Sequence, residues 1–480
     1  MVDVKTHEGK KPAPWLILIL LIFIGLIPRI IDFINSSGIE LDGVFYATAG
    51  RHISKGEFRE ALKGVFPPFY PLLIGISNFF IQDLEISGRI TSFIIGILLI
   101  LLCYFAVKKI FGTKYGLYMA FFVAIHPYLV RFSVQVLSES TAIFLFTISI
   151  FLFYFGHIKE KLYLIILSGI FLGLTYLTRP EYIVYPLPFA LFLLFHRRIK
   201  ELIAFLFCFL IVAFPYILYL KSETGLWVIS KKAILAKQQE TTSLSMYSYL
   251  FPVLSLFNVL KNIPSVIYHF FEAVFPTFMI LCFFGVKHVE KRFRLITALL
   301  FLFHIISISL ITSSTKRFSV EFIPIILVFS VAGIMKMEDY LKGSGKNKVL
   351  FSIIIFIVFA SSIYQGIIFQ DSGRILNKKA GLFMKTFDPG TKIASRIPLV
   401  PFYSNSEWVN FVEEIKIAKD CGELMDTLKK LGVKYIVIDE VLEKYAKGEG
   451  IDISKCNNIM GLNCVAIFGN NEEYIKILRL

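Results

Sequence analysis

Long apolar segments follow one another through the first 370 residues and constrain the fold of this chain more than any other feature. A helix needs about 20 apolar residues to cross a bilayer, and about 11 segments approach that length. Hydrophobic residues make up 56% of the chain and charged residues only 18%, a balance that a soluble core cannot hide. We therefore expect a polytopic α-helical membrane bundle. Its predicted spans are 15–34, which we interpret as an uncleaved signal anchor, 86–107, 115–131, 137–157, 162–178, 183–196, 201–220, 271–287, 295–312, 318–335 and 349–369.

Basic residues gather in every second loop between these segments. Short cytoplasmic loops of membrane proteins are enriched in Lys and Arg, so the formal net charge of +15 is better explained by topology than by binding of nucleic acid. The pattern predicts a cytoplasmic N-terminus and, because the number of spans is odd, an extracytoplasmic tail. The predicted inside residues are Lys5, Lys10 and Lys11; Lys108, Lys109 and Lys114; Lys159 and Lys161; Arg197, Arg198 and Lys200; Lys287, Lys291, Arg292 and Arg294; and Lys336, Lys342, Lys346 and Lys348.

The domain organisation follows from this pattern. Residues 1–370 form the predicted membrane domain. Its first outer loop, 35–85, contains the stretches 42–55 and 69–82, which are expected to be amphipathic helices at the membrane interface. A second long outer loop, 221–270, carries Lys231, Lys232 and Lys237.

Residues 371–480 change in composition, because charge rises and long apolar runs stop. A helix is predicted over 423–431, ending at Gly432, and strands over 433–439, 465–468 and 474–478. We expect this tail to form a small extracytoplasmic α/β domain.

The six cysteines give little support to a metal site. Three of them, Cys103, Cys208 and Cys282, lie in apolar segments and are expected to be buried, and no CxxC or His-rich spacing occurs. In the tail, a Cys456–Cys464 disulfide is compatible with an oxidising compartment, but it leaves Cys421 as an odd third thiol. No cofactor is predicted. A divalent ion would have to be held by Asp42 with Glu139, which no ligand cluster supports.

Ionisable residues are scarce at mid-membrane depth and gather instead at the predicted outer ends of helices. Acids and arginines lie on the same side, so a site there would combine a carboxylate base with cations that hold a phosphate. His126, which precedes Pro127 in an apolar segment, is expected to be a buried core residue. The outer-end residues are Asp42, Arg89, Arg131, Glu139, Arg179, Glu181, Lys316, Arg317 and Glu321.

Several of these residues occur in short motifs whose order and topology resemble the GT-C glycosyltransferases, and within them the protein O-mannosyltransferase and aminoarabinose-transferase group. The resemblance covers about residues 15–370, the part of the chain that contains the predicted spans. The first-loop Asp followed by Pro-Pro is the most specific part of it. The motifs are Leu41-Asp42-Gly43-Val44-Phe45-Tyr46, Pro67-Pro68-Phe69-Tyr70-Pro71, Ser87-Gly88-Arg89, Ser138-Glu139-Ser140, Thr178-Arg179-Pro180-Glu181 and Lys316-Arg317-Phe318 with Pro324.

The resemblance implies a reaction and residues for it. A sugar would move from a polyprenyl-phosphate carrier to a lipid, glycan or protein acceptor at the outer face of the cytoplasmic membrane, with inversion. Asp42 would be the general base and Glu139 a second acid. The implied residues for binding substrate and phosphate are Arg89, Arg131, Arg179, Arg317 and Tyr70.

Two departures from the family pattern bear on the carrier site and on any specific substrate. Many relatives have a second acid after the first-loop Asp, where this chain has Gly43, and some have a basic residue before Pro-Pro, where it has Phe66.

Structural explanations stand beside these roles. Asp42 and Glu139 would suit helix N-termini, and Arg179 and Arg317 would suit contacts with lipid headgroups. The rival functions are a transporter or lipid flippase, a non-catalytic scaffold that presents the tail, and a ligase for a whole lipid-linked glycan. Paired halves and broken central helices, which are typical of transporters, are not evident in the sequence.

Overall fold

The computed structural model describes residues 13–36, 38–231, 256–310, 315–341, 372–452, 462–470 and 472–480, with Phe356 and Ala360. The predicted span 349–369, the loop residues Lys232 and Lys237, the basic residues Lys342, Lys346 and Lys348, and Cys456 lie outside these described residues. The chain forms two compact units. The membrane unit comprises Met1–Ile34 and Thr48–Ile368, and the tail unit comprises Asn35–Ala47 and Phe369–Leu480. The sequence-based division at residue 370 did not group 35–47 with the tail.

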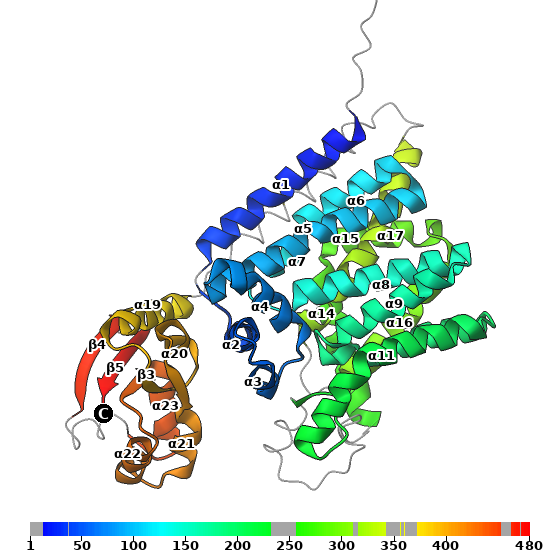
Figure 1. The fold of residues 1–480 in the computed structure, drawn as a ribbon. Coiled ribbons are helices and arrows are strands. Elements are labelled where there is room, and N and C mark those ends of the chain that lie inside the picture. Colours follow the sequence, from blue (N-terminus) through cyan, green and yellow to red (C-terminus); the bar gives the residue numbers. More distant parts are fainter. Residues whose placement is uncertain are drawn as a thin grey trace, which may run out of the picture. The chain divides into compact units, whose positions relative to one another are not determined.

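The membrane unit is helical throughout its described part, and its long helices run side by side (Figure 1). The segments 42–55 and 69–82 are the helices α2 and α4, as predicted. The helices are α1 (Pro14–Asn35), α2 (Leu41–Ser54), α3 (Phe58–Lys63), α4 (Phe69–Ile81), α5 (Leu84–Phe111), α6 (Thr113–Ile125), α7 (Pro127–Phe132), α8 (Glu139–Lys159), α9 (Leu162–Tyr176), η1 (Pro180–Val184), α10 (Pro186–Phe195), α11 (Ile199–Thr224), α14 (Leu256–Val274), α15 (Pro276–Gly285), η2 (Val286–His288), α16 (Lys291–Ser309), η3 (Lys316–Phe318), η4 (Val320–Phe322) and α17 (Ile323–Leu341).

The predicted polytopic bundle is confirmed, although the number of spans stays a prediction. Six described helices are long and apolar enough to cross a membrane, and the count is seven if one bent pair forms a single span. That pair, Leu260–Val274 and Pro276–His288, bends by 95°, and the break lies within the predicted span 271–287, which stays a prediction. Four further apolar helices are shorter: Phe69–Ile81, Thr113–Ile125, Leu162–Tyr176 and Pro180–Phe195.

Two buried side chains satisfy the carbonyls that helix breaks expose. Pro127 separates α6 from α7 and has no N–H to offer the carbonyl of Val123. Arg29, which is fully buried, donates from Nη1 to the carbonyl of Ala124 at 2.7 Å and from Nη2 to that of Val123 at 3.5 Å. His126 Nε2 lies 3.1 Å from the carbonyl of Val274, just before the bend between α14 and α15. His126 is therefore a core residue, as predicted.

The predicted inside loops meet at one end of the membrane unit. Lys109 lies beside Lys159, Arg198 pairs with Glu160 at 3.0 Å, and Lys114 pairs with Glu338. Because α8 ends at this basic end, Glu139 at its start lies at the opposite end. The alternation of basic and non-basic loops read from the sequence thus corresponds to two distinct ends of the bundle.

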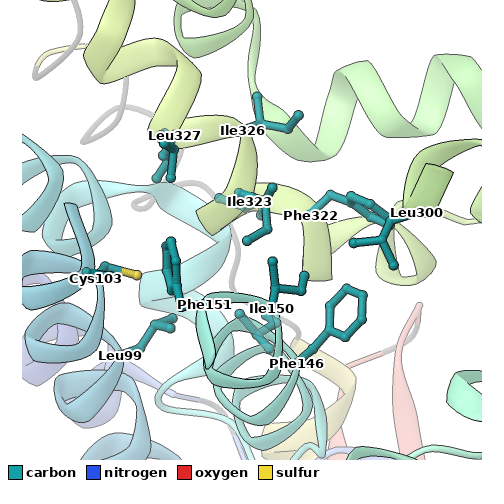
Figure 2. Packing of buried hydrophobic residues seen from close by; sticks show 14 of the residues in the cluster. Leu99, Cys103, Phe146, Ile150, Phe151, Leu300, Phe322, Ile323, Ile326 and Leu327 are labelled. Carbon is teal, nitrogen blue, oxygen red and sulfur yellow. The ribbon is translucent and has the colours of Figure 1, made fainter. Parts of the chain in front are cut away.

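The core of the membrane unit is apolar and rich in aromatic residues. Figure 2 shows Leu99 and Cys103 of α5 and Phe146 of α8 packed with residues of α16, η4 and α17. The helices α15 and α17 approach closely at two glycines: a Cβ on Gly285 would lie 1.8 Å from the carbonyl oxygen of Phe329, and one on Gly333 would lie 2.0 Å from that of Leu281. Only glycine permits this crossing.

In its described residues, the tail unit is an α/β domain with a sheet of five strands in the order β2-β1-β3-β5-β4. The strand β1 is parallel to β2 and β3, whereas β5 is antiparallel to β3 and β4. The predicted helix and three strands are present, and β1, β2 and four helices were not predicted. The elements are α19 (Ser372–Phe387), β1 (Lys392–Ser395), α20 (Leu399–Ser404), β2 (Glu407–Asn410), α21 (Phe411–Ile417), α22 (Cys421–Lys430), β3 (Tyr435–Asp439), α23 (Glu440–Gly448), β4 (Asn463–Gly469) and β5 (Tyr474–Arg479).

The cysteines differ from the expectation in one respect. Cys464 is an exposed free thiol, whereas Cys421 is disulfide-bonded, so a Cys456–Cys464 bond is excluded. The three membrane-segment cysteines are also free.

Candidate functional site

A carboxylate held by two arginines forms the centre of the candidate site. Glu139 is 1% exposed, and its Oε1 accepts from Arg317 Nε and Nη2 at 2.6 Å each and from Arg179 Nη1 at 2.8 Å. Within the described structure, Oε2 of Glu139 is buried and accepts no hydrogen bond. Charge-assisted bonds of this length are among the strongest in proteins, so the three side chains form one unit.

Three different elements bring these side chains together. Glu139 is the first residue of α8, Arg179 directly precedes η1, and Arg317 is the middle residue of η3. Pro180 follows Arg179 and favours extended backbone there, which ends the preceding helical run. The same guanidinium reaches Glu181 from Nε at 2.6 Å.

Lys316 adds a third cation next to this unit. Its ammonium pairs with Glu272 at 2.7 Å and lies 5.2 Å from the ring centre of Tyr128. Burial lowers the pKa of Lys316, but the Glu272 carboxylate and the Tyr128 hydroxyl offset that effect and leave the pKa above its ordinary value. Lys316 is therefore charged at any physiological pH.

A buried polar network ties the two arginine-bearing turns to each other a second time. Tyr185, at the end of η1, donates to Glu321 of η4 at 3.1 Å and lies 2.9 Å from His304 Nδ1. His304 Nε2 in turn lies 3.1 Å from the Ser319 hydroxyl, between η3 and η4. The turns are thus joined at Glu139 and again at Glu321, which fixes the spacing of Arg179 and Arg317. Glu321 had been grouped with the outer-end residues, but His304 and Tyr185 had not, since nothing in their local sequence marks them.

The other predicted phosphate residues lie in separate surroundings. Arg89 is buried in α5 and pairs with Glu85 at 2.7 Å. Arg131, in α7, shares with Arg89 the electrostatic neighbourhood of Asp32. Tyr70 is fully buried, and its hydroxyl lies 2.8 Å from that of Ser92, which places it in the packing of α4 on α5. Their substrate roles stay predictions.

Asp42 lies in the first turn of α2, half-buried, in the part of that helix that belongs to the tail unit. The residue two places earlier, Glu40, is 5% exposed and pairs with Arg374 at 3.4 Å. The sequence analysis did not single out Glu40, although the acid–x–acid spacing with Asp42 was a signal for it. Among the described residues there is no group of three or more His, Cys, Asp or Glu side chains that could hold a metal ion.

Comparisons with known proteins agree with this architecture. Residues 66–219 match the family model described as dolichyl-phosphate-mannose-protein mannosyltransferase. No curated protein sequence matches the chain. Among solved structures, ArnT from Cupriavidus metallidurans in the apo state has 13% identity and a TM-score of 0.62, with 97% of each chain covered.

Two further solved structures of this fold contain a lipid phosphate. ArnT from Cupriavidus metallidurans bound to undecaprenyl phosphate has 12% identity, a TM-score of 0.61, and coverage of 97% of this chain and 98% of that one. The oligosaccharyltransferase AglB from Archaeoglobus fulgidus, in complex with an inhibitory peptide and a dolichol-phosphate, has 14% identity and a TM-score of 0.58, with 96% and 74% covered. The predicted resemblance is confirmed. The chain shares the fold of these solved structures, and the family-model match over residues 66–219 agrees with the predicted resemblance.

Proposed function

We propose that this chain, a membrane protein with the GT-C glycosyltransferase fold, moves a sugar from a polyprenyl-phosphate carrier to an acceptor at the outer face of the cytoplasmic membrane. The observation that carries the proposal is the convergence of Arg179 and Arg317 on Glu139 at the end of the bundle opposite the basic loops. The matched family model and the lipid phosphates bound by ArnT and AglB support it.

The arginines would stabilise the leaving group. As the bond from the anomeric carbon to the phosphate oxygen breaks, negative charge grows on the lipid phosphate. A guanidinium has five N–H donors, so Arg179 and Arg317 can hold a phosphate while they also bind Glu139. Lys316, charged and adjacent, adds to the positive potential.

Asp42 would act as the general base. The acceptor hydroxyl or amine attacks the anomeric carbon from the side opposite the phosphate, and its proton passes to the Asp42 carboxylate. The products are the glycosylated acceptor with inverted configuration, the free lipid phosphate and protonated Asp42. Glu139 would set the positions of the arginines and supply a second acidic group. Arg89, Arg131 and Tyr70 remain candidates for binding the carrier.

The charges and the tail support one orientation in the membrane. The basic end of the bundle would face the cytoplasm by the positive-inside rule, and Glu139 with its arginines would then lie at the outer face. The disulfide-bonded Cys421 favours an oxidising compartment for the tail. The N-terminus would then be cytoplasmic and the tail domain extracytoplasmic, in a multi-pass protein of the inner membrane.

The partners would be a polyprenyl-phosphate-linked donor, membrane lipid, and a lipid, glycan or protein acceptor. A transporter or flippase is the competing function. A transporter would need no general base, so replacement of one carboxylate by its amide discriminates between the two.

The test compares cells whose own copy is deleted and replaced by wild type or by Asp42→Asn. If the chain is the transferase, its lipid-linked sugar donor accumulates in D42N cells and is consumed in wild-type cells, although both proteins reach the membrane in equal amounts. Lipid extracts analysed by mass spectrometry identify the donor. Equal donor levels in D42N and wild-type cells would rule out Asp42 as the base. Equal donor levels in cells that lack the protein and in wild-type cells would rule out the transferase.

A further inference from the structure

The residues just before Asp42 are held by the tail unit. The segment Asn35–Ala47 clusters with Phe369–Leu480 and not with the helices on either side of it in sequence. This grouping is unusual because α1 up to Ile34 and the second half of α2 belong to the membrane unit. The contacts that produce it lie immediately before and after the proposed base.

The first contact is a buried hydrogen bond from the backbone. The amide of Ile39 donates to the hydroxyl oxygen of Tyr403 in α20 at 2.8 Å, and Ile39 is fully buried. Gly38 has a φ of +145°, and a Cβ there would lie 3.1 Å from the same hydroxyl. A residue with a side chain at position 38 would strain the backbone and crowd Tyr403, so the approach requires glycine.

Two more contacts flank Asp42. Glu40, whose carbonyl accepts from Val44 to start the helix, pairs through its side chain with Arg374 of α19 at 3.4 Å. One turn after Asp42, the ring of Phe45 packs edge to face on Trp408 of β2, with centroids 6.1 Å apart. Three elements of the tail thus hold the start of α2 on both sides of the carboxylate.

We propose that the tail domain is the element that positions the catalytic base, with Tyr403 and Arg374 as positioning residues for Asp42. This inference rests on the proposed function for its catalytic part only. An Asp in the first turn of a helix moves with that helix start, and displacement of a reacting group by about 1 Å can cost about a hundredfold in rate. An unpaired Ile39 amide would have to find another acceptor, and the helix start would shift or fray.

The tail would thereby take part in the chemistry. A tail that only displayed an acceptor would tolerate loss of a single hydroxyl that faces the first loop. A tail that holds the base would not tolerate this loss. The rate of transfer would depend on that hydroxyl, whereas the affinity for the donor would not.

The test uses Tyr403→Phe in the full-length protein, with Tyr435→Phe as the matched control. Both changes remove one tyrosine hydroxyl from the same domain. The Tyr435 hydroxyl donates to Asp388 at 2.7 Å, a bond that does not involve residues 35–47. Hydrogen exchange of peptides covering 36–46 is measured in detergent for both variants and wild type. Initial rates are measured with the lipid-linked donor that accumulates in D42N cells.

We expect Y403F to speed exchange in 36–46, to lower kcat about tenfold and to leave the KM for the donor unchanged, whereas Y435F changes none of these. Arg374→Lys should retain most activity and Arg374→Gln should not. Unchanged exchange in Y403F, or exchange that rises equally throughout the tail, would overturn the inference. If even wild type consumes no donor, the proposed function fails, and the exchange data still decide whether Tyr403 anchors the loop.

Discussion

Arg317 donates from both Nε and Nη2 to the same oxygen of Glu139, at 2.6 Å each, across 178 residues of sequence. With Arg179 on that oxygen too, one carboxylate organises both cations of the candidate phosphate site.

Replacement of Glu139 by Gln should therefore disorder the arginine pair. An amide oxygen accepts more weakly than a carboxylate, and the two guanidiniums would repel each other across it. We expect the donor consumption rate to fall by about a hundredfold. Glu160→Gln is the control, because Glu160 pairs with Arg198 at the other end of α8 and is 72% exposed. Equal rates in E139Q and wild type would show that this carboxylate does not organise the site.

Arg29 should stabilise the break between α6 and α7. Arg29→Leu leaves the carbonyls of Val123 and Ala124 without their donor, at a cost of about 1–3 kcal/mol for each buried unpaired group. Thermal unfolding in detergent should show a lower midpoint for R29L and little change for Ile30→Leu, whose side chain is 46% exposed. A higher midpoint for R29L would mean that desolvation of the guanidinium outweighs its hydrogen bonds.

The tail cysteines test the proposed orientation. Cys464 is exposed and free, so a membrane-impermeant maleimide added to intact cells should label wild type but not Cys464→Ser. Cys421 should react only after reduction, because it is disulfide-bonded. Labelling of Cys464 that requires cell lysis would place the tail in the cytoplasm and contradict the topology.

The Asp388 carboxylate should stabilise the tail at neutral pH, and this stabilisation should be lost in acid. Hydrogen bonds from the Lys434 ammonium and the Tyr435 hydroxyl lower the pKa of Asp388 below its ordinary value of 3.8. A lowered folded pKa contributes stability above the unfolded pKa, and this contribution is lost as pH falls through the folded value. Asp388→Asn should therefore be less stable than wild type at pH 7, with the difference vanishing in strong acid.

Trp408 can report this unfolding once the other two tryptophans, Trp15 and Trp227, are replaced by Phe. Urea midpoints from its fluorescence are compared for D388N and the parent across the pH range. A difference that persists undiminished in strong acid would show that the carboxylate charge is not its cause.

Much of the membrane unit was readable from the sequence, because lipid imposes simple rules on it. A long apolar segment must be helical to satisfy its backbone, and basic loops reveal which helix ends lie together. The same reasoning placed Glu139, Arg179 and Arg317 at one end of the bundle, and it identified the tail helix that ends at Gly432. It did not anticipate the bend at Phe275, because a hydropathy pattern records apolar length and not helix direction.

What only the tertiary structure decided is which of these groups touch. The sequence gives no reason why Glu139 should take Arg179 and Arg317 while Arg89 takes Glu85, because each pairing depends on how helices far apart in sequence pack. Nor does it assign residues 35–47 to the tail: the hydroxyl of Tyr403 lies 364 residues from the Ile39 amide that it accepts from. Local chemistry sets which residues can carry charge at the outer face, whereas long-range packing sets their partners.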